Sequence, residues 1–352
     1  MKKIIFTIIA LALSISQFYQ SKNACMTDTV NSFSSKYKTF IGFSWGHDQW
    51  TKNVAPICRN RMFSGMTAAW YCDFFKDTVN GFKGHPVEAK PININGKLHR
   101  IIDMQPIKLF DAIASWNAGW MLLTLLLIVF IVKKNTLLWI FGMSAGILFA
   151  WTPAARGIIY PYDGPIMFLW VLVVLLGMSQ KYRYWIFPII MIGTGFKETI
   201  IVCSLIPFLW FDIPLKQRIK WFIICGTSAC FVKLFLSLIA ETTPFFTMQT
   251  KDILTKNFHG DPNCKLAFIK NVQALIHLRL DYPLFAIGGM LIALFLLPNK
   301  KIIVGWKIIS GLFVFNIMIF GIITEYRLWH ELVPVFLWCW TEGVNNGISP
   351  RA

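Results

Sequence analysis

Asp163 places a carboxylate at the start of an apolar segment, in the stretch IYPYDGPIMFLW. An ionisable side chain at membrane depth costs free energy and usually has a function. One interpretation is structural, because Asp is a favoured N-cap residue and its charge suits the positive end of a helix dipole. The other is chemical: Asp163 would bind a sugar hydroxyl, a metal ion or the proton of an acceptor. The two roles are compatible.

Lys197 and Glu198 form a second charged feature, in the stretch GTGFKETII. Adjacent helix positions point about 100° apart, so the two side chains do not simply neutralise each other. Either they form buried ion pairs with other helices, or Lys197 binds a phosphate while Glu198 orients it or holds a substrate. The sequence leaves both interpretations open.

Glu325 and Arg327 lie in the stretch TEYRLWHELVP, between two apolar segments. Arg327 and Glu331 are four residues apart, which predicts a local salt bridge on one helix face. The alternative is a phosphate site, because the planar fork of donors on an arginine binds two phosphate oxygens at once.

Three weaker candidates complete the set. Arg156 shares a short loop with Asp163, and Lys233 lies in an apolar segment from which its long side chain can extend outward. Asp48 follows His47 in the stretch SWGHDQW. His and Asp are both metal ligands, but two adjacent ligands are weak evidence for a metal site.

The elements that carry these residues are predicted to be membrane helices. The chain has 352 residues, of which 56% are hydrophobic and 14% charged, whereas soluble domains are about 25% charged. We therefore predict an all-α polytopic membrane protein with about nine to ten transmembrane or re-entrant helices. The apolar segments are residues 3–18, 116–132, 137–151, 164–178, 184–211, 221–240, 282–297, 302–323 and 328–340.

The distribution of Lys and Arg predicts the orientation of these segments. Residues 184–211 are too long for one plain span and form either one long tilted helix or a there-and-back pair that breaks at Gly193–Gly195. With the pair and a cytoplasmic N-terminus, every short basic loop falls on the cytoplasmic side. These cytoplasmic loops explain much of the net charge of +17. The sequence has no nucleic-acid-binding motif, so we expect no nucleic-acid partner. The basic residues concerned are Lys2, Lys3, Lys133, Lys134, Lys181, Arg183, Lys216, Arg218, Lys220, Lys300 and Lys301.

This orientation divides the chain into four parts. Residues 1–19 are a first transmembrane helix or a cleaved signal peptide, because two lysines precede a short apolar stretch. Residues 20–115 form a large extracytoplasmic loop, residues 116–341 a multi-helix membrane domain, and residues 342–352 a short cytoplasmic tail. We expect two disulfides on the outer side, with the pairing left open; the cysteines predicted there are Cys25, Cys58, Cys72 and Cys264.

The same orientation places the candidate charged residues together on the outer side. Independent structural ion pairs would not need to share one side, whereas a single outward-facing cavity would. Such a cavity suits a lipid with a phosphate head group, since Arg or Lys stabilises the phosphate and a carboxylate takes a proton from an attacking hydroxyl. The residues are Arg156, Asp163, Lys197, Glu198, Lys233, Glu325 and Arg327.

Three stretches, YPYDGP, GFKETII and EYRLWHELVP, resemble a group of bacterial proteins related to the C-type (GT-C) membrane glycosyltransferases, over about residues 116–340. The resemblance implies inverting transfer of a sugar from a polyprenyl-phosphate carrier to a glycan, lipid or protein acceptor. It implies that Asp163 is an acidic site residue, that Asp48, or less directly Asp28, is the acid of the first loop and the base, and that Arg327 binds the carrier phosphate. A divalent metal ion is a possible cofactor. The chain lacks a clear DxD pair and a C-terminal outer domain.

Two other functions remain open at this stage. A transporter or flippase of a lipid-linked or anionic substrate would also have intramembrane charges and a broken helix. A non-enzymatic surface-polymer assembly protein would need none of these charges for chemistry. We expect an integral protein of the bacterial inner membrane. For the transferase, we expect the active face to be extracytoplasmic.

Overall fold

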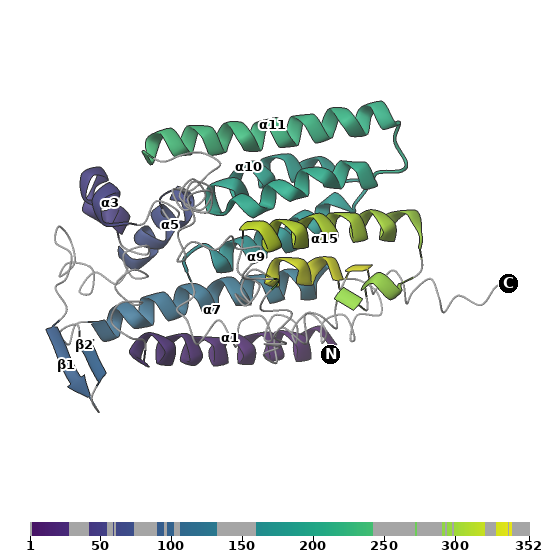
Figure 1. The fold of residues 1–352 in the computed structure, drawn as a ribbon. Coiled ribbons are helices and arrows are strands. Elements are labelled where there is room, and N and C mark those ends of the chain that lie inside the picture. The colour runs from purple at the N-terminus through teal and green to yellow at the C-terminus, as the bar shows by residue number, and fades with distance from the viewer. Residues whose placement is uncertain are drawn as a thin grey trace.

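The fold is given by a computed structural model that is mostly helical, which confirms the predicted helical class in its coarser form (Figure 1). Within the described residues, three helical windows are long and apolar enough to cross a membrane, and they are Asp111–Ile128, Leu215–Ile239 and Lys301–Met318. Shorter apolar helices cover Ile4–Tyr19, Asp163–Gly177 and Glu198–Leu209. The structure describes residues 2–27, 42–54, 59, 61–73, 90–94, 97–101, 106–131, 160–241, 272, 291–292, 294–297, 299–320, 329–336 and 338–339.

Helices α1 (Lys2–Thr27) and α7 (Pro106–Ile131) lie side by side and run in opposite directions (Figure 1). Both are longer than the predicted segments, and α7 begins within the predicted outer loop. Pro106 suits the first position of a helix, where its missing N–H is not needed. Phe6 and Ala10 pack against α7, and the other face of α1 exposes Ile4, Ile8, Leu11 and Ile15, an apolar stripe that suits lipid.

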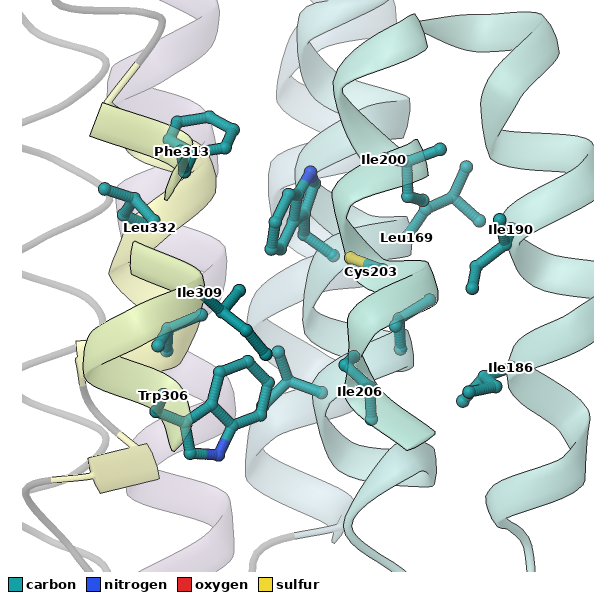
Figure 2. Close-up of a cluster of buried hydrophobic side chains, with 14 of the residues drawn as sticks. Leu169, Ile186, Ile190, Ile200, Cys203, Ile206, Trp306, Ile309, Phe313 and Leu332 are labelled. Carbon is teal, nitrogen blue, oxygen red and sulfur yellow. The ribbon is translucent and has the colours of Figure 1, made fainter. Parts of the chain in front are cut away.

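Helix α9 (Asp163–Gly177) is the centre of the apolar packing. One of its faces, with Trp170, belongs to the larger core cluster, and the other, with Met167, packs with α1 and α7. Figure 2 shows the larger cluster, in which the Trp170 ring meets the ring of Phe313 edge-on at 5.6 Å between centroids. A helix that is apolar on every face is buried on every face, which fixes the position of Asp163 at its first residue.

The predicted there-and-back pair is a hairpin of α10 (Ile186–Phe196) and η3 (Glu198–Leu209), preceded by the short helix η2 (Arg183–Trp185). Lys197 separates the two arms in an extended conformation, with φ −161° and ψ 133°. Asp212, just after η3, pairs with Arg183 at 2.7 Å, so the chain has returned to its starting level. The break falls two residues after the predicted Gly193–Gly195.

Helix η3 has twelve residues in 3-10 geometry, an unusual length, since such runs rarely exceed three or four residues. Pro207 lies inside it and has no N–H to donate. Helix η3 is therefore wound more tightly than the adjoining α10, and it rises further per residue.

Helices α11 (Leu215–Ile239) and α15 (Lys301–Phe320) both start at the end of the molecule opposite to α3 and α5 (Figure 1). Their lengths agree with the predicted segments to within a few residues, apart from six extra residues at the start of α11. The outward face of α11 exposes large apolar side chains, as expected for a helix in contact with lipid; these include Ile223, Phe231, Phe235 and Leu238.

The predicted outer loop contains regular structure. It holds η1 (Gly42–Trp45), α3 (His47–Asn53), α5 (Met62–Asp73) and an antiparallel hairpin of β1 (Lys90–Ile94) and β2 (Lys97–Ile101). The hairpin departs from the all-α prediction. A last short helix, η5 (His330–Leu332), lies near the C-terminal end of the chain.

Predicted segment 137–151 and the first part of predicted segment 282–297, residues 282–290, lie outside the described residues. Three of the four cysteines in the predicted disulfides also lie outside the described side chains: Cys25, Cys58 and Cys264. The fourth, Cys72, is buried on α5. Cys203, Cys225 and Cys339, which lie in the predicted apolar segments, are buried. Cys230 lies on the exposed face of α11.

We expect the Arg183–Asp212 pair to stabilise the fold only above acidic pH. Hydrogen bonds from Arg183 are the main reason that the pKa of Asp212 lies below its ordinary value of 3.8. A lowered carboxyl pKa contributes stability above the unfolded-state pKa, and this is lost as the pH falls through the folded-state pKa. Because the Asp212 side chain is 41% exposed, the contribution should be below about 1 kcal/mol. The melting temperature of Asp212→Asn should therefore lie below that of wild type at neutral pH and become equal to it in acid. A difference in melting temperature that does not change with pH would contradict the assignment.

Candidate functional site

Six charged side chains from separate segments gather where α9 begins and the α10–η3 hairpin turns. Within the described residues they are three cations and three carboxylates, and all except Glu198 are almost completely buried. We call this set the ionic cluster: Arg61, Asp163, Lys197, Glu198, Lys233 and Glu331.

The first part of the cluster, its carboxylate half, is centred on Lys197. The Lys197 ammonium forms a salt bridge with Oε1 of Glu331 and lies 3.9 Å from Oδ1 of Asp163. All three side chains are at most 2% exposed. Two carboxylates share one ammonium, so this half carries an excess negative charge. Oε2 of Glu331 makes no hydrogen bond within the described part of the chain.

Asp163 does not act as the predicted N-cap. Tyr162 holds the N-cap position of α9, and no side chain caps the helix. Oδ2 of Asp163 instead accepts a hydrogen bond from the backbone N–H of Tyr160 at 3.2 Å. The carboxylate therefore tightens the turn before α9, with its other oxygen near Lys197.

The second part of the cluster, its cationic half, is centred on Glu198. Arg61 donates two hydrogen bonds to this carboxylate, from Nη2 to Oε1 at 2.6 Å and from Nε to Oε2 at 3.1 Å. Nζ of Lys233 lies 3.5 Å from Oε2. Of these three described side chains two are cations and one is a carboxylate, so together they carry one net positive charge. Glu198 is 36% exposed, whereas Arg61 and Lys233 are 7% and 5% exposed.

The aromatic ring of Tyr162 joins the two halves. The guanidinium of Arg61 lies 4.1 Å from the centre of this ring, and Nζ of Lys197 lies 5.8 Å from it. Both distances are within the range of cation–π contacts. The indole N–H of Trp116 donates to the carbonyl of Pro161 at 3.0 Å, which ties the YPYD stretch to α7.

Glycine at position 195 lets α5 approach the break in the hairpin. A Cβ on Gly195 would lie 2.1 Å from Cδ2 of Phe63, closer than real side chains come. Phe63 therefore packs over Gly195 and Phe196, and this contact brings the neighbouring Arg61 to Glu198. The local structure of the turn and the docking of α5 thus build the cationic half together.

Burial of six charges is costly unless each is paired and hydrogen-bonded. A structural network would explain the burial and the overall neutrality. The uneven division of charge goes further, because it creates two chemically different places side by side. The carboxylate half is suited to accept a proton, and the cationic half is suited to hold an anion.

The structure brings together four of the residues singled out in the sequence: Asp163, Lys197, Glu198 and Lys233. Asp48 is not among them, since it lies on α3 with 90% of its side chain exposed and contacts His47 at 3.7 Å. Asp28, Arg156, Glu325 and Arg327 lie outside the described residues. The predicted pair of Asp163 with Asp48 therefore has no geometric support.

Sequence reasoning missed Arg61 and Glu331. Glu331 was assigned to a local pair with Arg327, but η5 is a 3-10 turn and Glu331 reaches Lys197, 134 positions away. The usable signal was its place in the apolar stretch LWHELVPVFLW, where a carboxylate is costly. Arg61 lies in a polar stretch of the outer loop, and nothing in its local pattern indicates burial.

The suggested metal site at His47 and Asp48 finds no third ligand. No group of three His, Cys, Asp or Glu side chains is placed to hold a metal ion within the described residues. Nε2 of His47 instead lies 3.1 Å from the carbonyl oxygen of Ile239. This hydrogen bond is the main reason that the pKa of His47 is raised, and it docks α3 onto the end of α11.

Comparisons of the chain with protein-family models, with curated proteins and with solved structures find no match. The function must therefore be argued from the ionic cluster itself.

Proposed function

We propose that this protein is a membrane glycosyltransferase that moves a sugar from a polyprenyl-phosphate carrier to an acceptor on the extracytoplasmic face of the bacterial inner membrane. The observation that supports this most is the division of the ionic cluster into a carboxylate half and a cationic half in contact with each other. Transfer of a sugar from a phosphate needs both, a base for the acceptor hydroxyl and positive charge for the departing phosphate.

The roles follow from the charges. Arg61 and Lys233 would hold the carrier phosphate, and Asp163 or Glu331 would take the proton of the acceptor hydroxyl. Lys197 would keep the two carboxylates in position without leaving both charges uncompensated. These assignments replace Asp48 as the base, because its exposed place on α3 gives it no partner in the cluster.

The proposed orientation comes from the ends of the helices. The cluster lies where α11 ends and α9 begins, whereas the basic residues near the starts of α11 and α15 are at the opposite end. The positive-inside rule makes that basic end cytoplasmic. On the sequence alone, Arg156 and Arg327 remain proposed ligands of the phosphate and Glu325 remains a proposed substrate-binding residue.

Lipids that co-purify with the protein test this proposal. Native mass spectrometry in mild detergent is expected to find a polyprenyl-phosphate species on the wild type and to lose it in Arg61→Gln/Lys233→Gln, because both phosphate-binding cations are removed. Arg218→Gln is the matched control: it removes a cation at the basic end and should leave the lipid bound. Bulk phospholipid alone in all three samples would remove the main support for a carrier-lipid enzyme.

A transporter is the second candidate, favoured by one observation. The extended break at Lys197 between two helical arms, with buried charges at the break, is a feature of transporter binding sites. Counterflow of a labelled polyprenyl-phosphate sugar in proteoliposomes, without any transferred product, would favour the transporter. A surface-polymer assembly protein without enzymatic activity would give neither a transferred product nor counterflow, and its function would tolerate Asp163→Asn.

A further inference from the structure

The cationic half holds Glu198 in the way that arginine and lysine hold a phosphate. We propose that Arg61 and Lys233 form a binding site for a phosphate ester, and that Glu198 is the internal occupant which the phosphate displaces. Glu198 would then close the empty site and give way to the substrate.

The geometry of Arg61 is the first support. Its Nη2 and Nε atoms point in parallel at the two oxygens of Glu198, at 2.6 and 3.1 Å. This planar fork matches two oxygens of a phosphate as well as those of a carboxylate. Lys233 adds a point charge 3.5 Å from one of the same oxygens. A phosphate in the place of the Glu198 carboxylate would keep all three contacts.

The charge balance is the second support. Among the described residues, the two buried cations both pair with the carboxylate of Glu198, which carries one negative charge. A phosphate monoester, which the carrier becomes once its sugar has been transferred, carries about −1.5 to −2 at neutral pH, and this charge balances the two cations better than a carboxylate does. Buried cations are strongly destabilised when they lose their partner. The site should therefore exchange one anion for another rather than stand empty.

The freedom of Glu198 to leave is the third support. It is the most exposed member of the cluster, at 36%, while the cations that hold it are buried. It directly follows the extended residue Lys197 and begins the helix η3. A change of the Glu198 side-chain rotamer would move its carboxylate without displacing Arg61, just before α5, or Lys233 on α11.

This inference rests on the proposed function in that the phosphate is taken to belong to a carrier lipid. The probes chosen below need no sugar transfer, so the two ideas can fail separately. If phosphate exchange is observed but no sugar is transferred, the enzyme proposal fails and the anion site stands.

Removal of the internal occupant should strengthen phosphate binding. Phosphate binding is measured in two arms. In the first, the full-length protein is titrated with inorganic phosphate in detergent. In the second, it is reconstituted into nanodiscs with and without phosphatidic acid. We expect Glu198→Gln to bind phosphate about tenfold or more tightly than wild type, because no charged hydrogen-bond partner must be displaced. Arg61→Gln should lose the binding. A gain with inorganic phosphate shows a site open to water, and a gain only with phosphatidic acid shows a site that takes a lipid head group.

Asp212→Asn is the matched control, because Asp212 is likewise a carboxylate held by an arginine, at 2.7 Å, but at the other end of the hairpin. It should not change phosphate binding. An equal gain in Glu198→Gln and Asp212→Asn would mean that any released arginine binds phosphate, and it would overturn the inference. So would unchanged or weaker binding by folded Glu198→Gln in both arms. If Glu198→Gln does not fold, Glu198→Asp, which keeps the charge on a shorter side chain, should show a smaller gain, and no gain there overturns the inference as well.

Discussion

Replacement of Lys197 by Met is expected to destabilise the folded protein by about 3–5 kcal/mol, the usual cost of removing one partner of a buried ion pair. The ammonium of Lys197 pairs with Glu331 and lies 3.9 Å from Asp163, and all three side chains are buried. Without it, two carboxylates face each other in apolar surroundings. Denaturant or thermal unfolding in mild detergent measures the effect.

Two further variants give this result its meaning. Lys307→Met removes a lysine that also has several partners, donating at 2.9 Å to the carbonyl of Phe295 and at 2.7 Å to that of Leu297, but at a more exposed place. It should cost about 1 kcal/mol. In Lys197→Met/Glu331→Gln the second substitution should restore part of the lost stability, since one carboxylate charge is gone. Equal effects of Lys197→Met and Lys307→Met would show that the cluster is not desolvated.

Replacement of Asp163 by Asn is expected to lower sugar transfer by about 10²- to 10⁴-fold, the usual contribution of a general base. The amide has nearly the shape of the carboxylate and can still meet the N–H of Tyr160 through its oxygen, but it cannot take a proton. Polyprenyl-phosphate should still co-purify, because Arg61 and Lys233 are unchanged. The rate of product formation with a polyprenyl-phosphate sugar is the measurement.

Glu331→Gln separates the two carboxylates of the same half. If Asp163 is the base and Glu331 only positions Lys197, the Glu331 variant should lose less activity than Asp163→Asn. The reverse order would make Glu331 the base. Full activity of both variants would show that the carboxylate half takes no part in proton transfer, and it would contradict the assignment of the base to this half.

The helices were predictable where apolar runs are long and bounded by charge. The segment that starts at Asp163 and the segment from 302 follow directly from such runs, and the hairpin followed from the charges and glycines inside the run from 184 to 211. The exact break did not, because Gly193 and Gly195 are used for contact: Ile200 and Phe63 pack where their Cβ atoms would be. Which role a glycine has depends on a neighbour that is distant in sequence.

The candidate site was predictable only as far as local chemistry reaches. Asp163, Lys197, Glu198 and Lys233 stand out because charge inside an apolar run is costly, and loop charges placed them on one side. Glu331 was given the nearest partner in sequence instead of Lys197, its partner in space. Arg61 needed the docking of α5, which a polar outer stretch does not reveal.

The unusual helix η3 also sets the depth of the site. A 3-10 helix rises about 2.0 Å per residue and an α-helix about 1.5 Å. The arms Arg183–Phe196 and Glu198–Leu209 therefore both span roughly 23 Å, although they contain different numbers of residues. The hydrocarbon layer of a membrane is about 30 Å thick. If Arg183 and Asp212 lie at one membrane boundary, as the proposed orientation implies, the hairpin turns back about 7 Å short of the other. An ion or head group that reaches Lys197 would then travel below the lipid surface, along a path that the protein itself provides.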